Sequence, residues 1–395
     1  MDLQYSPEQL AFRDDVRRWL QANLPADLKD KVASYLHLEK EEVMRWHRIL
    51  ADKGWIAPHW PVEWGGTGWD AVQRYIFEEE CSHAGAPQLP GLSLMFCAPV
   101  LIAFGTPEQR RRFLPRIYSG EDFWCQGYSE PAAGSDLAAL QTRAVREGDH
   151  YIVTGHKIWT TQAHWANWMF CLVRTDPQAG KKQEGISFLL IDMQTPGITV
   201  RPVILMDGSH EVNEVFLDEV KVPVANLVHE EGQGWEVAKY LLNYERLSAG
   251  RIGASKRQLA RLKDMAGRQI TRGRSLMEDP RFRDRLSRVE IELMALEITN
   301  LRYLDRMVRS GQPPGAEVSL LKIKGTAIQQ QLSELMLQAA GPHGQRGMPQ
   351  GGEIDAHDSL TAALAPRYFN LRKLTIAGGT DEVQRNIIAK MRLGL

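Results

Sequence analysis

The sequence predicts an α+β protein built from three consecutive parts. We expect an N-terminal all-α domain over residues 1–122, a middle antiparallel β-barrel or sandwich domain over 123–231, and a C-terminal four-helix bundle over 232–395. Three observations lead to this expectation: helix start signals in the first part, short β-rich runs in the second, and long helical stretches in the third. At 395 residues the chain is also too long for one hydrophobic core.

Helix start signals recur in the first part. Ser6-Pro7-Glu8 places a capping hydroxyl, a proline at the first helical position and a first-turn carboxylate before an amphipathic run that extends to Leu24. Thr106-Pro107-Glu108 repeats this signal. The loop from Trp60 to Gly66 separates helices between these two starts. Residues 1–120 therefore read as helical.

Short runs of β-branched and aromatic residues distinguish the middle part. They are separated by turn-forming pairs such as Gly148-Asp149 and Pro196-Gly197. No long helical pattern lies between them, so a doubly wound parallel sheet is not predicted. The runs are Tyr151–Val153, Trp168–Val173, Ile186–Ile191, Ile198–Val200 and Val215–Leu217.

The third part reads as helix almost throughout. The expected helices cover about 234–273, 281–310, 315–340 and 360–394. Proline and glycine mark the breaks, for example at Asp279-Pro280. Four long helices with short connections favour an up-and-down bundle.

Composition limits the class of function. The chain is 43% hydrophobic and 25% charged with a net charge of −1, which gives no electrostatic reason to expect nucleic acid or an anionic membrane as a partner. From Cys81 to Pro107 no charged residue occurs, yet prolines and glycines interrupt the segment. We read it as buried helix and loop rather than a membrane span.

The cysteines indicate a reducing compartment. Cys81, Cys97, Cys125 and Cys171 lie far apart and form no pair with metal-ligand spacing, so we expect reduced, mostly buried thiols and no metal site. The acidic N-terminus is unlike a transit peptide. We expect a cytoplasmic protein.

The stretch Gly127–Asp136 is the most informative in the chain. Glu130-Pro131 favours an extended residue followed by a fixed φ, and Gly134 permits a tight turn that ends in Ser135 and Asp136. Such a turn suits a surface that approaches a bulky ligand. The stretch resembles the first signature of the acyl-CoA dehydrogenase family.

Two further segments strengthen this resemblance. Gly155–Thr161 looks like the family's Gly-x-Lys-x-Trp-Ile-Thr strand, and Gly378–Asn386 looks like its final signature. The helical, then β, then four-helix order is the family's architecture, so the resemblance covers essentially the whole chain. The branch that it most resembles contains the large subunits of pimeloyl-CoA dehydrogenases.

The resemblance implies FAD as cofactor. Gln126, Tyr128 and Ser129 would lie against the flavin, with Ser129 bonding the ring edge. Trp159 would cover one face, and Thr161 would donate toward N5. Donors of this kind are needed because charge builds on the flavin as it is reduced. Outside their motifs, these residues would read as an ordinary core aromatic and ordinary strand hydroxyls.

The resemblance also implies contacts with the rest of FAD. Gln338 with Gly341 and Pro342 fits the turn that reaches the diphosphate of a neighbouring subunit's FAD, although Pro342 removes a backbone donor. Arg268 is what remains of a degraded Arg-x-x-Phe-Gly segment. Thr380 and Glu382 match FAD-contacting positions of the last signature, and no Gly-x-Gly-x-x-Gly or Walker loop occurs.

The catalytic base departs from the commoner family pattern. The usual Glu just before Gly-Thr is here Gly378, whereas Glu245 stands where some members carry the base on a bundle helix. The helical neighbours of Glu245 are not basic, so its carboxylate would be desolvated, as a base near neutral pH requires. They are Leu241, Leu242, Ser248 and Ala249. Arg246 is an expected substrate-binding residue. Its side chain either orients the Glu245 carboxylate or is a surface charge.

The implied reaction is α,β-dehydrogenation of an acyl-CoA to a trans-2-enoyl-CoA. Glu245 would remove the α-proton, and the backbone N–H at Gly378 would hold the thioester oxygen. Ser135 would lie near CoA, and the segment Leu92–Ala103 would line the acyl chain. An electron-transfer flavoprotein would accept the electrons. The turn at Gln338 implies a homotetramer, or a heterotetramer with a related subunit, and fatty-acid β-oxidation is the expected setting.

Three other interpretations stay open. The same scaffold supports flavin oxidases and monooxygenases, which rapid reoxidation by air would favour. A non-catalytic subunit that binds FAD or acyl-CoA in a heteromer is a second alternative, and a purely structural helical protein is a third. The sequence gives neither the length nor the branching of the acyl chain.

Overall fold

The computed structural model divides by internal contacts into two compact units. One comprises residues 1–42, 69–88 and 246–395, and the other comprises 43–68 and 89–245. Residues 5–248, 250–271, 273–310, 315, 318–345 and 356–394 are described, except for the side chains of 243–248, 271, 307, 308, 310 and 356–360. The units do not follow sequence order, and the three-domain division stays a prediction.

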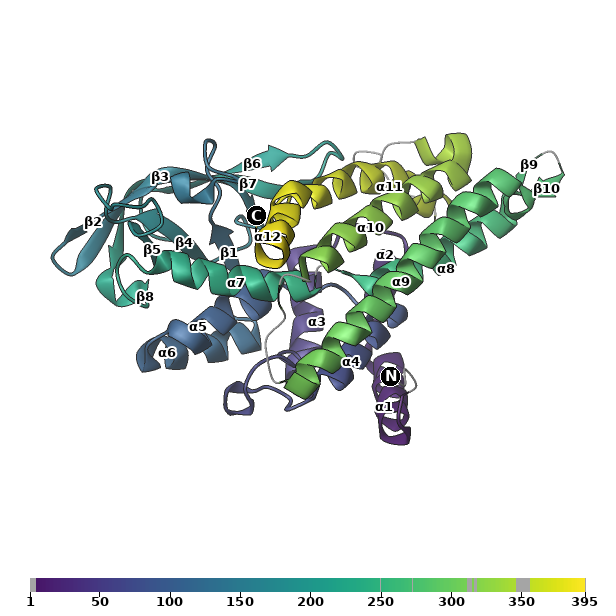
Figure 1. Ribbon diagram of the computed structural model, residues 1–395, viewed down its shortest axis with the longest axis horizontal. Coiled ribbons are helices and arrows are strands. Elements are labelled where there is room, and N and C mark those ends of the chain that lie inside the picture. The colour runs from purple at the N-terminus through teal and green to yellow at the C-terminus, as the bar shows by residue number, and fades with distance from the viewer. Residues whose placement is uncertain are drawn as a thin grey trace. The chain divides into compact units, whose positions relative to one another are not determined.

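The second unit is built around one eight-stranded sheet (Figure 1). Its path of paired strands is β6-β7-β3-β2-β4-β5-β8, with β1 paired to β4. The pairs are antiparallel except β1–β4 and β2–β4, which are parallel, so the predicted antiparallel pattern holds with two exceptions. The strands are β1 (Trp124–Gly127), β2 (Arg143–Glu147), β3 (His150–Thr161), β4 (Trp168–Arg174), β5 (Ile186–Asp192), β6 (Ile198–Ile204), β7 (His210–Pro223) and β8 (Leu227–Val228).

Apolar alternation explains the core of this sheet. The strands place Tyr151, Val153, Val215 and Leu217 inside a fully buried cluster, whereas β6 carries polar residues at exposed positions. Helix α6 (Pro107–Ser119) packs on the sheet through Phe113. The other helices of this unit are α3 (Lys40–Lys53, most of it), η1 (Val62–Trp64), η2 (Leu92–Cys97), α5 (Ala98–Phe104), η3 (Leu137–Ala139), η4 (Val224–Asn226) and α7 (Gly234–Ser248, as far as residue 245).

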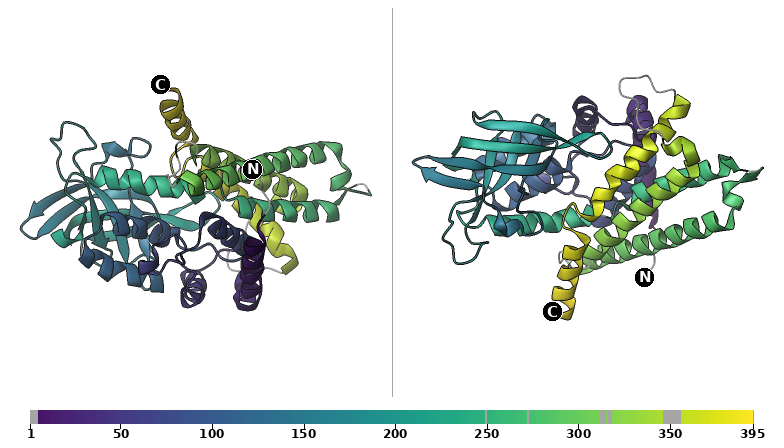
Figure 2. Two further views of the ribbon diagram at one scale, coloured as in Figure 1. Left: turned by 60° about the horizontal axis from the view of Figure 1, so that its bottom comes forward. Right: turned by 90° about the horizontal axis from the view of Figure 1, so that it is seen from above.

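The first unit is helical, with α10 (Val318–Ala340) at its centre. Helices α8 (Ile252–Arg268), α9 (Pro280–Ser310), α11 (Ala356–Leu371) and α12 (Asp381–Leu393) all contact α10 (Figures 1 and 2). Small strands β9 (Ile270–Thr271) and β10 (Arg274–Ser275) join α8 to α9 with η5 (Leu276–Glu278), while η6 (Gly341–Gln345) and η7 (Arg372–Thr375) complete the connections. The N-terminal helices α1 (Pro7–Asn23), α2 (Ala26–Ala33) and α4 (Ala71–Ala84) belong to this unit.

The predicted helix starts are confirmed. Ser6 caps α1 and Thr106 caps α6, each in a reciprocal capping box with a glutamine three residues later. The predicted proline occupies the first turn in both helices. Local sequence therefore determines where these helices begin.

Two of the four long C-terminal helices were expected to be continuous and are not. The stretch predicted at 234–273 is divided into α7 and α8, and Arg251 caps α8 in a left-handed conformation with φ of 42°. The stretch predicted at 360–394 is interrupted by η7 and by Gly378 and Gly379, with φ of 67° and 81°. A helix requires negative φ at every residue, so these positions end the helical path.

Candidate active site

A buried ion pair connects the first signature with the Gly-x-Lys-x-Trp strand. The ammonium of Lys157, fully buried in β3, lies 2.8 Å from Oε1 of Glu130 and donates to the carbonyls of Tyr128 at 3.2 Å and Leu172 at 2.8 Å. The backbone N–H of Ile158 also donates to the carbonyl of Ser129 at 2.9 Å. These bonds hold Ser129 beside the end of β3.

Glu130 is ionised in this buried position. Burial acts to raise the pKa of Glu130, but the ammonium of Lys157 and hydrogen bonds from Thr142 and Gln141 outweigh burial, so this pKa lies below its ordinary value. The backbone N–H groups of Gln141 and Thr142 donate to its two oxygens at 2.6 and 2.9 Å. Both members of the buried ion pair therefore have further hydrogen-bond partners. These bonds offset the free-energy cost of burying two charges.

A β-bulge in β3 turns a large aromatic side chain outward. Lys157 is paired with Val215 and Thr160 with Asn213, so β3 has one residue more than β7 between these pairs. Trp159 lies in the bulge with φ of 60°, and the residue is 56% exposed. A left-handed backbone is unusual for a bulky residue, and bulges beside active sites re-aim side chains. The Trp159 side chain is therefore exposed at the surface and is not packed in the core of the sheet.

Open hydrogen-bonding groups lie on the same two segments. Gln126, Ser129 and Thr161 are half-buried, and their side chains make no hydrogen bond to any residue that the structure describes. An exposed indole with hydroxyl and amide donors nearby in the fold suits a flat ligand with polar edges. The residues on these segments therefore fit a flavin ring.

The ring of Tyr128 lies in the core of the sheet. Its side chain is 6% exposed and lies edge-on to Phe170 and Phe188 in the sheet. Alternation along an extended segment explains this, since neighbours on either side point the opposite way. The structure brings Ser129 to the outward surface and places the Tyr128 ring in the core.

The uncharged segment before α6 packs against β1. The hydroxyl of Ser93, in the π-helix η2, accepts a hydrogen bond from the Trp124 N–H at 3.0 Å, and the indole N–H of Trp60 donates to the Leu94 carbonyl at 2.8 Å. Single π-turns occur often at functional sites. The segment proposed to line the acyl chain therefore adjoins the strand that carries Gln126.

The structure shows less about Ser135 and Glu245, the other two predicted residues of this unit. Ser135 is exposed on the turn after Glu130. Glu245 belongs to the last turn of α7, and with Arg246 its side chain lies outside the described residues. Among the expected helical neighbours, Leu241 is buried, and Ala249 lies outside the described residues. The roles of Glu245 and Arg246 stay predictions.

In the first unit, the Gly378-Gly379 turn is held by buried side chains of α12 and α10. Gln384, 1% exposed, donates to the Gly378 carbonyl at 3.2 Å. Lys322 of α10 forms a buried 3.0 Å ion pair with Asp381 at the start of α12. The two left-handed glycines open a turn that residues with a Cβ rarely adopt.

Thr380 and Glu382 lie at the start of α12. The Thr380 hydroxyl accepts from the Val383 N–H at 3.2 Å, so Thr380 is the helix N-cap. Glu382 is exposed, and hydrogen bonds from its own backbone and from Thr380 lower the pKa of its carboxyl. Both are explained by capping alone, whatever ligand they also meet.

The remaining predicted cofactor residues are on α8, α10 and η6. Gln338 is exposed and bonds Arg285 and Glu334, while Arg268 is exposed and pairs with Asp264 at 2.9 Å. Gly341 has φ of 58° at the start of η6 and is followed by exposed Pro342. The structure keeps Gln338 and Gly341 at one helix end and gives Arg268 a local partner.

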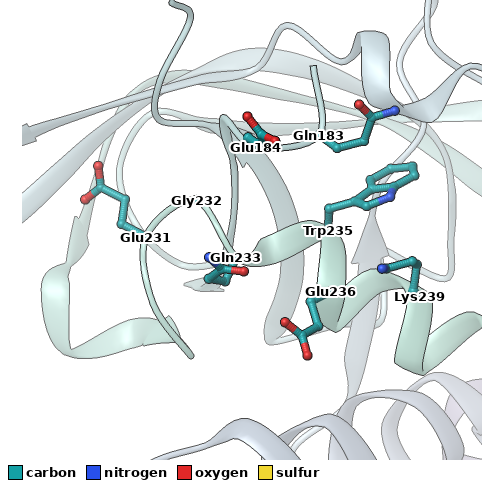
Figure 3. Close-up of a pocket in the computed structure, with 8 residues that line it drawn as sticks. All are labelled: Gln183, Glu184, Glu231, Gly232, Gln233, Trp235, Glu236 and Lys239. Atoms are coloured by element: carbon teal, nitrogen blue, oxygen red, sulfur yellow. The ribbon is translucent and has the colours of Figure 1, made fainter. Parts of the chain in front are cut away.

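A surface pocket of about 270 Å³ in the second unit lies elsewhere (Figure 3). None of the residues predicted from the motifs lines it, and three of its side chains are carboxylates. The hydroxyl of Tyr151 donates to one of them, Glu231, at 2.6 Å. Such a lining is unsuited to a phosphate-bearing ligand. The lining residues are Gln183, Glu184, Glu231, Gly232, Gln233, Trp235, Glu236 and Lys239.

Sequence reasoning missed the residues that hold the site together. Lys157 belongs to the Gly-x-Lys-x-Trp segment, but no sequence pattern predicts its ion pair with Glu130. The available signal was a charged residue on the same face of β3 as buried Tyr151 and Val153, since residues two and four apart along a strand share a face. Asn213 and Gln384 carry no comparable local signal.

The part of the chain that the structure describes contains no group of three or more His, Cys, Asp or Glu side chains placed to hold a metal ion. Within the same residues, no helix combines the length and the apolar character that crossing a membrane would require.

Family models match three consecutive parts of the chain. The N-terminal, middle and C-terminal domain models of acyl-CoA dehydrogenases match residues 6–121, 125–220 and 232–393. These matches and the fold define a class of oxidoreductase whose members are FAD-dependent. The chain belongs to the acyl-CoA dehydrogenase family, and its activity is that of an acyl-CoA dehydrogenase.

Individual relatives and solved structures match nearly the whole chain. The acyl-CoA dehydrogenase IpdE1 of Mycobacterium tuberculosis is 36% identical over 97% of both chains. The solved structure of the Tcur3481-Tcur3483 steroid ACAD matches with a TM-score of 0.86 and 29% identity over 100% of this chain and 99% of that one. The ChsE4-ChsE5 complex from M. tuberculosis matches with a TM-score of 0.84 and 32% identity over 100% and 99%.

Proposed function

We propose that this chain catalyses FAD-dependent α,β-dehydrogenation of an acyl-CoA thioester to the trans-2-enoyl-CoA. The observation that carries the proposal is the surface held by Lys157 and Glu130. There the first signature and the end of β3 are bonded together, with Trp159 exposed. This surface fits a flavin ring, and the family match supplies the reaction class.

The residues of this surface have separate tasks. The Trp159 indole would pack on one face of the ring, while Gln126, Ser129 and Thr161 would donate to its polar edge. Tyr128 would support this edge through its backbone. Bound FAD would supply the acceptor for the hydride, which carries both electrons of the oxidation. Donors fixed before the reaction stabilise charge that develops during it.

For the distal half of FAD, support comes from motif position alone. Gln338, Gly341 and Pro342 would reach the diphosphate of a neighbouring subunit's FAD. Thr380 and Glu382 would contact it from the start of α12. Arg268 has the weakest support, because Asp264 already pairs with its guanidinium.

Glu245 is the proposed catalytic base. Its carboxylate would accept the pro-R α-proton while the β-carbon loses a hydride, so that the two electrons of the α-C–H bond form the new double bond. The N–H of Gly378 would donate to the thioester oxygen as enolate character grows. Arg246 and Ser135 would hold the substrate, Arg246 beside the base and Ser135 near CoA.

The substrate class is inferred from the named relatives. One matched structure is described as a steroid ACAD, which favours an acyl-CoA that carries a bulky fused-ring group over a plain fatty acyl chain. The segment Leu92–Ala103, with a π-helix that widens its backbone, would form one wall for such a group.

Assembly with a related subunit is part of the proposal. Two matched structures are described by two proteins each, the ChsE4-ChsE5 complex and Tcur3481-Tcur3483. We therefore favour a heteromer over a homotetramer, with an electron-transfer flavoprotein as acceptor. The resemblance to pimeloyl-CoA dehydrogenases stays a prediction.

Anaerobic flavin bleaching tests the function. The chain, alone and co-expressed with a related subunit from its own genome, is titrated with straight, branched, dicarboxylic and steroid-ring acyl-CoAs. We expect bleaching with the ring substrates, and formation of the enoyl-CoA in equal amount. A flavoprotein that no acyl-CoA bleaches would favour the non-catalytic alternative, and fast reoxidation by air would favour an oxidase.

A further inference from the structure

The end of β3 is under backbone strain on both sides of Thr160-Thr161. Trp159 and Gln162 both have left-handed φ, at 60° and 55°. A left-handed backbone is strained at any residue other than glycine, so surrounding contacts must hold the segment. The question is which contact does so.

The side chain of Asn213 is placed to hold the strained end of β3. Asn213 of β7 faces Thr160 across the sheet and is fully buried. Its Nδ2 donates to the Thr160 carbonyl at 3.0 Å and lies 3.1 Å from Nδ1 of His164, while its Oδ1 lies 2.7 Å from Nε2 of His210. Both N–H groups of this amide and its oxygen are thus directed at the bulge or at a histidine.

The bonding pattern fixes the orientation of the amide. The Thr160 carbonyl can only accept, so the amide nitrogen must face it and the amide oxygen must face His210. His210 then carries a proton on Nε2, and His164 presents the lone pair of Nδ1 to the amide. The two rings stack with centroids 3.9 Å apart, which holds both beside Asn213.

We propose that Asn213 is a positioning residue for the flavin surface. Its amide, oriented by His164 and His210, holds the strained bulge in the conformation that presents Trp159 and Thr161. This inference rests on the proposed function, because it assigns those two residues to the flavin. Asn213 itself acts through the backbone of Thr160 and touches neither substrate nor cofactor.

A matched pair of variants separates positioning from general stability. Asn213→Asp keeps the shape but removes the donor to the Thr160 carbonyl. The control is Asn226→Asp, since buried Asn226 makes a similar 2.8 Å bond to the Leu190 carbonyl in the same unit. Both are studied at pH 8.

Two readouts are measured on each variant. Amide hydrogen exchange of the apoprotein over residues 157–164 reports the bulge without any flavin. Titration with FAD reports the surface. We expect Asn213→Asp to lose exchange protection there and to weaken FAD binding roughly tenfold to a hundredfold, the scale of a small misplacement of binding groups. Asn226→Asp should change neither by more than about twofold.

Each outcome decides a different claim. Unchanged exchange over 157–164 in Asn213→Asp, or equal loss of FAD affinity in both variants, would overturn the positioning role. Failure of the unsubstituted protein to bind FAD would overturn the proposed function, while the exchange measurement would still judge Asn213. If Asn213→Asp does not fold, His210→Phe, which removes the donor that orients the amide, replaces it in both measurements.

Discussion

The ammonium of Lys157 and the carboxylate of Glu130 are 2.8 Å apart and both are buried, so one ion pair connects two sequence motifs 27 residues apart. Ser129 lies next to one partner in sequence, and Trp159 lies two residues after the other. The pair therefore positions the groups proposed for flavin binding, and its loss should affect both stability and FAD affinity.

Lys157→Met should destabilise the protein strongly. The substitution leaves the Glu130 carboxylate buried without its counter-charge, and breaking a buried pair in this way costs about 3–5 kcal/mol. Urea unfolding at pH 7 measures the change. Lys182→Met is the control, because the exposed Lys182–Asp136 pair at 3.4 Å should contribute less than ~1 kcal/mol. Equal losses in the free energy of unfolding for the two variants would show that the buried pair stabilises the protein no more than the exposed pair does.

Glu130 should also make stability depend on acid pH. Its pKa is lowered in the folded chain from the usual 4.5, so the unfolded chain binds a proton more readily. Its contribution is complete above that usual value and is lost as the pH falls through the lower folded value. Urea unfolding between pH 7 and pH 3 should show a steeper loss for the natural protein than for Glu130→Gln. Parallel curves would contradict this sign.

Glu245→Gln should abolish turnover while FAD stays bound. The amide keeps the size of the side chain but cannot accept the α-proton, and a general base contributes ~10²–10⁴-fold. We expect a loss at the upper end in the rate of anaerobic bleaching. Glu236→Gln on the same helix is the control and should bleach normally. Near-normal bleaching by Glu245→Gln would place the base elsewhere.

Adding Gly378→Glu to Glu245→Gln would restore the commoner family arrangement. The structure indicates a cost, because Gly378 has φ of 67° and a residue with a Cβ is strained there. We expect partial recovery of bleaching with lower thermal stability. Recovery without any loss of stability would mean that this turn is not strained.

Trp159→Leu should weaken FAD binding with little change in unfolding. The residue is 56% exposed, so removal of the indole takes little from the core. Aromatic stacking contributes ~0.5–1.5 kcal/mol beyond buried area, which predicts roughly a twofold to tenfold rise in the FAD dissociation constant. Trp55→Leu, at a half-buried tryptophan of the same unit, should leave FAD affinity unchanged. Equal affinity in both variants would remove Trp159 from the flavin surface.

Gly379→Ala should disturb the turn at Gly378. The new Cβ would lie 2.7 Å from the Gln384 amide, which donates to the Gly378 carbonyl. Strain and displacement together should cost roughly 1 kcal/mol or more and lower kcat. Gly208→Ala shares the positive φ but has open space around it, so it isolates the strain. An equal cost at both positions would mean that the Gln384 contact yields without consequence.

Local sequence determined much of the fold. The capping boxes at Ser6 and Thr106, the β-rich runs of the sheet and the helical stretches around α9 and α10 all form as predicted, because caps, alternation and helical periodicity act over a few residues. The breaks at Arg251 and Gly378 were missed, since an otherwise helical pattern continues on both sides of each.

Only the tertiary structure decided how the motif residues are held. The sequence placed Ser129, Trp159 and Thr161 in recognisable motifs, and the family matches support the class of reaction. The sequence alone could not show that Lys157 pairs with Glu130 or that β3 bulges at Trp159. Nor could it show that Asn213 bonds Thr160 and contacts two histidines. These depend on register and burial between distant segments, which no local pattern encodes.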